Sequence, residues 1–321
     1  MSDATYSGQA KVYKKQGGNE LVIAAGGLLT LEGAVSGLVP GTNFFVSSVT
    51  GSSSNDGLSW STPKATLAQA LALCTANKND RIYLAPDHAE SVGASGLAWN
   101  KAGVSIIGIG NGANRPTFTW TTTDAVVTVS GANTLIRNIR TLTSVDECVS
   151  MFNVTAAGVT FDAVDFVETA SAQAQAIQWL LTTAAADYLT IKNCFHTQVN
   201  AAASAQKWIQ LVGVDHARIV DNTFLLVARA DTASHLISGS TAVVYCEIAR
   251  NNILFIGGTI TIVINLVTGS TGIIADNRIG SGTAVATAAV ITADGCFMFN
   301  NLWADTAAAS GLLAPAVDTD T

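Results

Sequence analysis

The sequence predicts an all-β protein that folds as a parallel β-helix, and the first supporting observation is a repeat. A short phrase such as Ile-Lys-Asn-Cys-Phe at 191–195 recurs at a mean interval of about 27 residues. Each copy starts with an apolar anchor, followed by a mixed position and then usually Asn or Asp. The anchors are Ile82, Ile106, Ile136, Phe161, Ile191, Ile219, Ile248, Ile274 and Met298. This period is typical of solenoids, in which one repeat forms no core alone and stacks on its neighbours.

The residues between the anchors favour strands over helices. They form short runs rich in Val, Ile, Thr and Phe, without the long segments of period 3.6 that helical repeats need. A second apolar row precedes the anchor row on each turn. Its members are Val127, Phe152, Leu180, Ile209, Leu236, Val263 and Val290. Asn and Asp suit the corners because they tolerate the left-handed region, so we expect a coil whose turns stack roughly 4.8 Å apart.

The composition limits the classes of partner. Charged residues make up only 12% of the chain, about half the usual share, which suits a close-packed column whose outer faces are covered by other protein. The net charge of −7, without a basic stripe, argues against a nucleic-acid partner. No apolar run has the length of a membrane span, and the N-terminus lacks the pattern of an export signal. We therefore expect synthesis in the cytoplasm and no membrane partner.

Residues often found in metal or sugar sites are here expected to be structural. The five cysteines, odd in number and without a CxxC pair, are predicted to be buried thiols. His196, His216 and His235 lie at different offsets from their anchors, so the sequence predicts no metal site and no cofactor. Most tryptophans are spread over the column, which favours packing in the core or between subunits. These are Trp99, Trp120, Trp179, Trp208 and Trp303.

Residues 1–41 differ from the rest and are expected to form an N-terminal arm. The stretch 9–18 is polar, and the segment 20–33 is interpreted as two short strands broken by Gly26-Gly27. Such an arm has too little apolar surface to fold alone. We therefore expect the column, sister chains or a larger assembly to hold it. The residues expected to make assembly contacts are Tyr13, Lys14, Lys15, Leu21, Val22 and Ile23.

Residues 42–80 are expected to begin the column with a strand, a Gly/Ser/Asn/Asp loop and a capping helix. The helix is predicted over roughly 65–76, with Thr62-Pro63 as its start. One apolar face of this helix can cover the open end of the column. That face consists of Leu67, Ala70, Leu71 and Cys74. This order of elements resembles the first segment of the right-handed pectate-lyase-like β-helix superfamily. The resemblance implies a right-handed column over 81–303 and identifies a scaffold, not a chemistry.

The arm carries a second resemblance. Its sequence at 13–21, Tyr-Lys-Lys-Gln-Gly-Gly-Asn-Glu-Leu, and the Gly-punctuated strands behind it are similar to the N-termini of bacteriophage structural proteins. Residues 304–321 are expected to be an Ala-rich tail. The resemblance and the low charge together imply a non-enzymatic virion protein without catalytic residues, most specifically a capsid decoration (cement) protein. Its partners would be the major capsid protein or other virion proteins, and the expected assembly is a homotrimer.

The main alternative is a tailspike or fibre β-helix that binds or cleaves a host surface polysaccharide. Arg137, Asp162 and Lys192 follow the anchors of three consecutive turns, and a basic residue there could remove the proton next to a uronate carboxylate. Asp162 and Asp165 share a turn, and hydrolysis needs two carboxylates about 5–9 Å apart. They are separated by an odd number of positions, however, so in a straight strand they would face opposite sides. For an enzyme, the catalytic candidates are therefore Asp162, Asp165, Lys192 and Arg137.

Two further interpretations of these residues stay open. Arg137, Asp162 and Lys192 could form only a surface salt-bridge ladder, with each pair worth under about 1 kcal/mol. The column could also bind carbohydrate without cleaving it, as an adhesin does.

Overall fold

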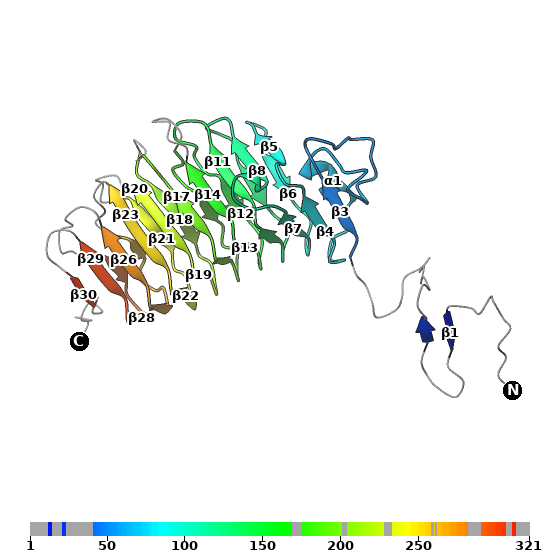
Figure 1. Cartoon of the computed structure of the whole chain (residues 1–321). Helices are drawn as coiled ribbons and strands as arrows, with labels where there is room; N and C mark the ends of the chain where they lie inside the picture. Colours follow the sequence, from blue (N-terminus) through cyan, green and yellow to red (C-terminus); the bar gives the residue numbers. More distant parts are fainter. Residues whose placement is uncertain are drawn as a thin grey trace, which may run out of the picture. The chain divides into compact units, whose positions relative to one another are not determined.

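The structure is a computed structural model of the chain, which divides into two compact units, Met1–Pro40 and Gly41–Thr321. It describes residues 12–14, 21–23, 41–168, 175–200, 204–227, 233–257, 260, 262–281, 290–305 and 310–312. In the second unit, short strands stack turn upon turn into three sheets (Figure 1). Neighbouring strands in these sheets run parallel, except for one antiparallel pair at the end of the second sheet. This is the predicted parallel β-helix.

Between Arg81 and Asp305 the strands of the three sheets follow one another in rotation along the chain. The first sheet contains β3 (Asn43–Val46), β4 (Arg81–Leu84), β7 (Ser105–Gly108), β10 (Leu135–Arg137), β13 (Thr160–Asp162), β16 (Thr190–Lys192), β19 (Arg218–Val220), β22 (Cys246–Ala249), β25 (Gly272–Ala275) and β28 (Cys296–Phe299). The second sheet contains β5 (Ala89–Val92), β8 (Thr117–Trp120), β11 (Arg140–Thr143), β14 (Asp165–Glu168), β17 (Phe195–Thr197), β20 (Thr223–Val227), β23 (Asn252–Gly257), β26 (Arg278–Ser281), β29 (Leu302–Asp305) and β30 (Ser310–Leu312). The third sheet contains β6 (Leu97–Trp99), β9 (Val127–Val129), β12 (Phe152–Val154), β15 (Leu180–Thr182), β18 (Lys207–Val212), β21 (His235–Thr241), β24 (Ile264–Leu266) and β27 (Ile291–Ala293).

The predicted anchor row is confirmed residue by residue. Each anchor pairs in register with the next along the first sheet, from Ile82 to Met298. The second apolar row is confirmed for its first four members in the third sheet. Its last three members were placed one residue early, since Ile237, Ile264 and Ile291 hold the register. Their preceding neighbours are buried as well, so apolar character alone did not distinguish the two positions.

The corner between the first and second sheets uses one left-handed residue per turn, as predicted. Its φ angle lies between 54° and 59° throughout, and Asn or Asp occupies most of these positions. The residues are Asn138, Ala163, Asn193, Asp221, Arg250, Asp276 and Asn300. The next residue points inward. On the last four turns it is a fully buried asparagine, and these side chains bond to one another in a row that we call the asparagine ladder. Its members are Asn222, Asn251, Asn277 and Asn301.

Aromatic side chains fill the core of the earlier turns. Phe152 lies at their centre, with its ring centroid 5.2 Å from those of Trp120 and Phe161. Trp99, Trp120, Trp179 and Trp208 are fully buried, which confirms core packing for them, whereas Trp303 is partly buried. Four of the five cysteines are buried free thiols as predicted, and Cys296 is half-buried. Burial raises the pKa of the Cys74, Cys148 and Cys194 thiols to about 12, so they are inert fillers of the stack.

A single α-helix, α1 (Leu67–Leu73), precedes the first full turn. Thr66 caps it in a capping box with Gln69, so the predicted start at Thr62-Pro63 was too early. Leu67, Ala70 and Leu71 are buried on the predicted face and the helix contacts β3, β4 and β6. No helix of the described residues is long and apolar enough to cross a membrane.

The first unit contains two described strands, β1 (Val12–Lys14) and β2 (Leu21–Ile23), which pair antiparallel. The strand pair therefore includes part of the stretch expected to be a polar arm, and Gly26-Gly27 lies outside the described residues. Five of the predicted assembly residues lie on these strands, whereas Lys15 lies outside the described residues. Their role in assembly stays a prediction. At the other end of the chain, β30 lies inside the segment expected to be a tail and pairs with β29.

Candidate functional site

Asp162 and Asp165 lie on either side of the corner between the first and second sheets. Asp162 ends β13, and Asp165 begins β14 after the left-handed Ala163 and the inward-facing Val164. A straight strand would have placed the two aspartates on opposite faces, but the corner turns both of them outward. Their side chains are only 12% and 13% exposed, because cationic side chains from neighbouring turns cover them. We call these two aspartates and the four cations around them the charged cluster.

Asp162 stands between Arg137 and Lys192 on three consecutive strands. One carboxylate oxygen lies 3.6 Å from Nε of Arg137 and 3.9 Å from Nζ of Lys192. The other oxygen accepts a 2.9 Å hydrogen bond from the Asn193 amide. The two cations are 56% and 40% exposed, and both distances are too long for hydrogen bonds. The predicted salt-bridge ladder is therefore present, but the cations keep their donors free within the part of the chain that the structure describes.

Asp165 is held more tightly, by two arginines from the preceding turns. Nε of Arg140 donates to it at 3.2 Å, and Nη1 of Arg115 lies 3.8 Å from the same oxygen. Arg115 also donates to the backbone carbonyl of Ala163 in the corner, at 3.5 Å. These contacts add Arg115 and Arg140 to the candidate site. Neither was predicted from the sequence, since Arg140 follows the corner that Arg137 precedes and Arg115 lies at another offset.

The charged cluster combines four cations with two carboxylates, a formal excess of two positive charges on a chain of net charge −7. A neighbouring network on later turns is balanced instead. There, Arg218 bonds to Glu247 at 2.8 Å and Arg250 bonds to Asp221 at 2.9 Å. The charged cluster therefore has the composition of an anion-binding site, whereas the second network satisfies its own charges.

The aspartates are poorly placed for hydrolysis. A glycosidase needs one carboxylic acid that gives up a proton and one free carboxylate. Here both carboxylates accept hydrogen bonds and face cations, so neither is open to a substrate. No group of three or more His, Cys, Asp or Glu side chains in the described residues could hold a metal ion. The chemistry available in the cluster is therefore that of its cations.

Glu168, on the same turn, does not join the cluster. Its side chain points into the core, and burial raises the pKa of its carboxyl to about 8. One oxygen accepts a 2.9 Å hydrogen bond from the backbone of Ala176. His196, on the next turn, is buried between the rings of Phe166 and Phe224, and burial lowers its pKa well below the usual value. Both groups are structural parts of the core.

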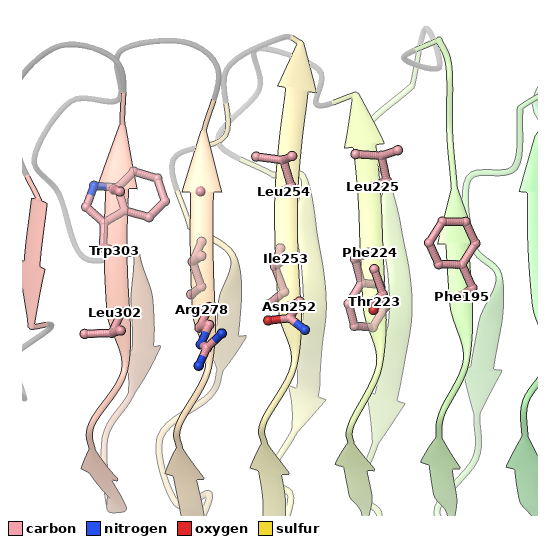
Figure 2. Close-up of a pocket in the computed structure, with 13 residues that line it drawn as sticks. Phe195, Thr223, Phe224, Leu225, Asn252, Ile253, Leu254, Arg278, Leu302 and Trp303 are labelled. Atoms are coloured by element: carbon pink, nitrogen blue, oxygen red, sulfur yellow. The ribbon is translucent and has the colours of Figure 1, made fainter.

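A groove of about 630 Å³ crosses the outer face of the second sheet, over β17, β20, β23, β26 and β29 (Figure 2). One column of outward residues along it is polar and contains Thr223, Asn252 and Arg278. The next column is apolar and contains Leu225, Leu254 and Gly280. Phe195, which is 43% exposed, closes the end of the groove nearest to Asp165. This groove was not predicted from the sequence. The available signal was the apolar run at 253–256, because it places apolar residues on both faces of β23, including the outer one.

The described fold is similar to solved structures of carbohydrate-cleaving proteins. A rhamnogalacturonan lyase matches with 12% identity over 81% of this chain and 87% of its own, at a TM-score of 0.46. A lacto-N-biosidase of glycoside hydrolase family 136 from Eubacterium ramulus matches with 11% identity over 81% and 67%, at a TM-score of 0.42. A pectate lyase matches with 15% identity over 81% and 79%, also at 0.42. These likenesses concern the fold, a parallel β-solenoid of the right-handed type.

No protein-family model matches the sequence, and no curated protein matches it. The comparison with solved structures corrects one prediction. The protein was expected not to be an enzyme, whereas the three similar structures reported above are two lyases and a biosidase.

Proposed function

We propose that the protein is a polysaccharide-active β-helix that binds an acidic glycan at the charged cluster and cleaves it by β-elimination. The observation that carries this proposal is the pair of exposed cations, Arg137 and Lys192, whose donors are unused on either side of Asp162. Two strand spacings separate them, about 10 Å along the column. A glycan that carries carboxylates supplies negative charge, which balances the excess positive charge of the cluster.

The two cations suit different tasks. The Arg137 guanidinium stays charged and offers a planar fork of donors that matches a uronate carboxylate. Neutralising that carboxylate makes the adjacent carbon–hydrogen bond more acidic. The amine of Lys192 acts as the general base that takes this proton, a role that lysines perform in enzymes. The electron pair of the broken bond then forms the carbon–carbon double bond. The glycosidic bond breaks, and the leaving oxygen takes a proton from the lysine ammonium or from water.

Asp162 acts as a positioning residue in this proposal. Its carboxylate, fixed by Asn193 at 2.9 Å, keeps the two cations from turning away into solvent. Hydrolysis by Asp162 and Asp165 is not supported, because both carboxylates are occupied by cations. A place in a virion, a capsid protein as partner and a homotrimeric assembly stay predictions.

The test uses polygalacturonate as an acidic polymer and dextran as a neutral one. We expect the purified protein to bind only polygalacturonate, more weakly as salt is added, and to release unsaturated products that absorb in the ultraviolet. Lys192→Ala should lower the rate of release by about 100-fold or more while binding persists. Arg137→Gln should weaken binding.

Arg218→Gln is the matched control, since Arg218 is similarly exposed but belongs to the balanced network. It should leave both binding and cleavage unchanged. Equal binding of dextran would contradict the recognition of acidic glycans. Binding of polygalacturonate without unsaturated products would refute the elimination chemistry.

A further inference from the structure

The groove on the second sheet continues directly from the charged cluster. Arg140, Asp165 and Phe195 occupy one outward column on three adjacent strands, β11, β14 and β17. The first two belong to the cluster, and the third closes the near end of the groove. The same column then runs on through Thr223 and Asn252 to Arg278. Five strand spacings separate Arg140 from Arg278, about 24 Å along the column.

A cation lies one strand before the far end of the groove, where Leu302 follows Arg278 in the same column. Arg278 is exposed and forms no ion pair with any described residue, in contrast to the arginines of both surface networks. Its guanidinium lies beside the groove in Figure 2. The column therefore places a paired cation near one end, an unpaired cation near the other end, and an uncharged stretch between them. A chain that carries several negative charges is complementary to this arrangement.

The uncharged stretch is amphipathic across its width. Thr223 and Asn252 offer hydrogen-bonding groups on one side, and Leu225 and Leu254 offer apolar surface on the other. Gly280 leaves open space above the floor of the groove. A side chain at this position would crowd Leu254, because its Cβ would lie 3.1 Å from Cδ1 of Leu254. A sugar ring has the same division, with hydroxyl groups at its rim and carbon–hydrogen bonds on its faces. The exposed ring of Phe195 adds a flat apolar surface on which such a face can stack.

We infer that this groove is a second subsite, which takes the continuation of the acidic glycan and binds a further carboxylate at Arg278. The inference rests on the proposed function and extends it, because it makes affinity depend on the length of the chain. A short acidic oligosaccharide fills the charged cluster alone. A longer one also covers the groove and reaches Arg278.

The experiment measures dissociation constants for galacturonate oligomers of graded length. With the wild-type protein, affinity should rise again once the oligomer is long enough to span the groove. Arg278→Gln and Phe195→Ala should each remove this gain, by about tenfold, and leave the affinity for short oligomers unchanged. Arg218→Gln serves as the control for the loss of an exposed arginine. A thermal melt checks that each variant is folded. We expect both variants to fold, because the replaced side chains are exposed.

Four results would overturn the inference. Affinity that does not depend on length, or an equal loss with Arg218→Gln, would show that the groove contributes no subsite. Self-association of the wild-type protein that Phe195→Ala abolishes would assign the groove to a second copy of the chain. Failure of every oligomer to bind would remove the proposed function as well. A flat length dependence with intact binding of short oligomers would instead overturn the subsite alone.

Discussion

The earlier and later turns of the column share one backbone but distribute polarity in opposite ways. At the inward position after the corner, the earlier turns carry Ile139, Val164 and Cys194, whereas the last four turns carry the asparagine ladder. On the outer face of the second sheet the order reverses. The earlier turns carry the charged cluster, and the later turns carry the largely apolar groove.

This difference shows that the parallel pairing of strands does not determine which side chains occupy equivalent positions. Each turn satisfies its backbone through bonds to the turns before and after it, whatever the side chains are. Side chains at equivalent positions are thus free to pack, to bond to one another or to bind a ligand. The asparagine ladder provides hydrogen bonds at the corner, and the earlier turns fill the same space with apolar groups. The predictions below test this contrast, from the largest expected effect to the smallest.

The largest effect is expected in the aromatic core of the earlier turns. Phe152→Ala should lower the free energy of unfolding by about 3–5 kcal/mol, because four rings around it would border a cavity. Those rings belong to Trp99, Trp120, Phe161 and Phe166. Denaturant unfolding provides the measurement. Ile264→Ala, in the same column of the aliphatic later turns, should cost less, and an equal or greater cost would break the comparison.

Glu168 is the ionisable exception inside the core of the earlier turns. The pKa of its carboxyl is about 8 in the folded protein and near 4.5 in a solvated chain. Between these values the folded state binds more protons than the unfolded state, so stability falls as pH rises through this window. Glu168→Gln should remove this slope. Unfolding curves at a series of pH values check it, and an unchanged slope in the variant would assign the pH dependence to other groups.

The asparagine ladder should be the next most sensitive feature. Asn251→Ala removes bonds to Asn222, Asn277 and the carbonyl of Ile219, and leaves these buried groups with fewer hydrogen bonds. We expect a loss of about 2 kcal/mol. Asn252→Ala is the matched control, since that neighbouring side chain is exposed, and should change stability by less than about 0.5 kcal/mol. Equal losses would mean that the ladder adds nothing beyond strand packing.

The smallest change in stability is expected in the charged cluster. Asp162→Asn should alter the free energy of unfolding by under about 1 kcal/mol, because the ion pairs are half exposed and long. The same variant raises the excess of positive charge from two to three. It should therefore tighten the binding of polygalacturonate at low salt, as titration calorimetry can measure. Weaker binding would show that Asp162 affects affinity more by positioning the two cations than by repelling the negatively charged ligand.

The sequence predicted the structure best at positions where the local geometry requires one type of residue on every turn. The anchor row was predicted in full because apolar residues recur once per turn at a fixed place before the corner. The left-handed corner was predicted from Asn138, Asn193 and Asp221, although Ala163 and Arg250 adopt the same conformation without that signal. The helix start was misplaced because Thr66 offers a capping box in addition to the proline signal at Thr62-Pro63.

The site was less predictable, since it depends on how turns of unequal length align. Arg137, Asp162 and Lys192 were found because they share one offset from the anchor. Arg115 and Arg140 reach Asp165 from different offsets, so no periodic pattern linked them. The groove arises from Gly280 and from outward Leu225 and Leu254, which in a sequence look like further core residues. Burial therefore had to be known before these residues could be recognised as surface.

The proposed function depends most on Arg137 and Lys192, the two exposed cations that flank Asp162. The most direct test is the affinity for polygalacturonate of the wild-type protein and of the double variant Arg137→Gln, Lys192→Gln, measured at low salt. We expect tight, salt-sensitive binding by the wild-type protein and a loss of at least tenfold in the variant, with an unchanged melting temperature. Equal affinity in both proteins would contradict the recognition of an acidic glycan at this corner of the column.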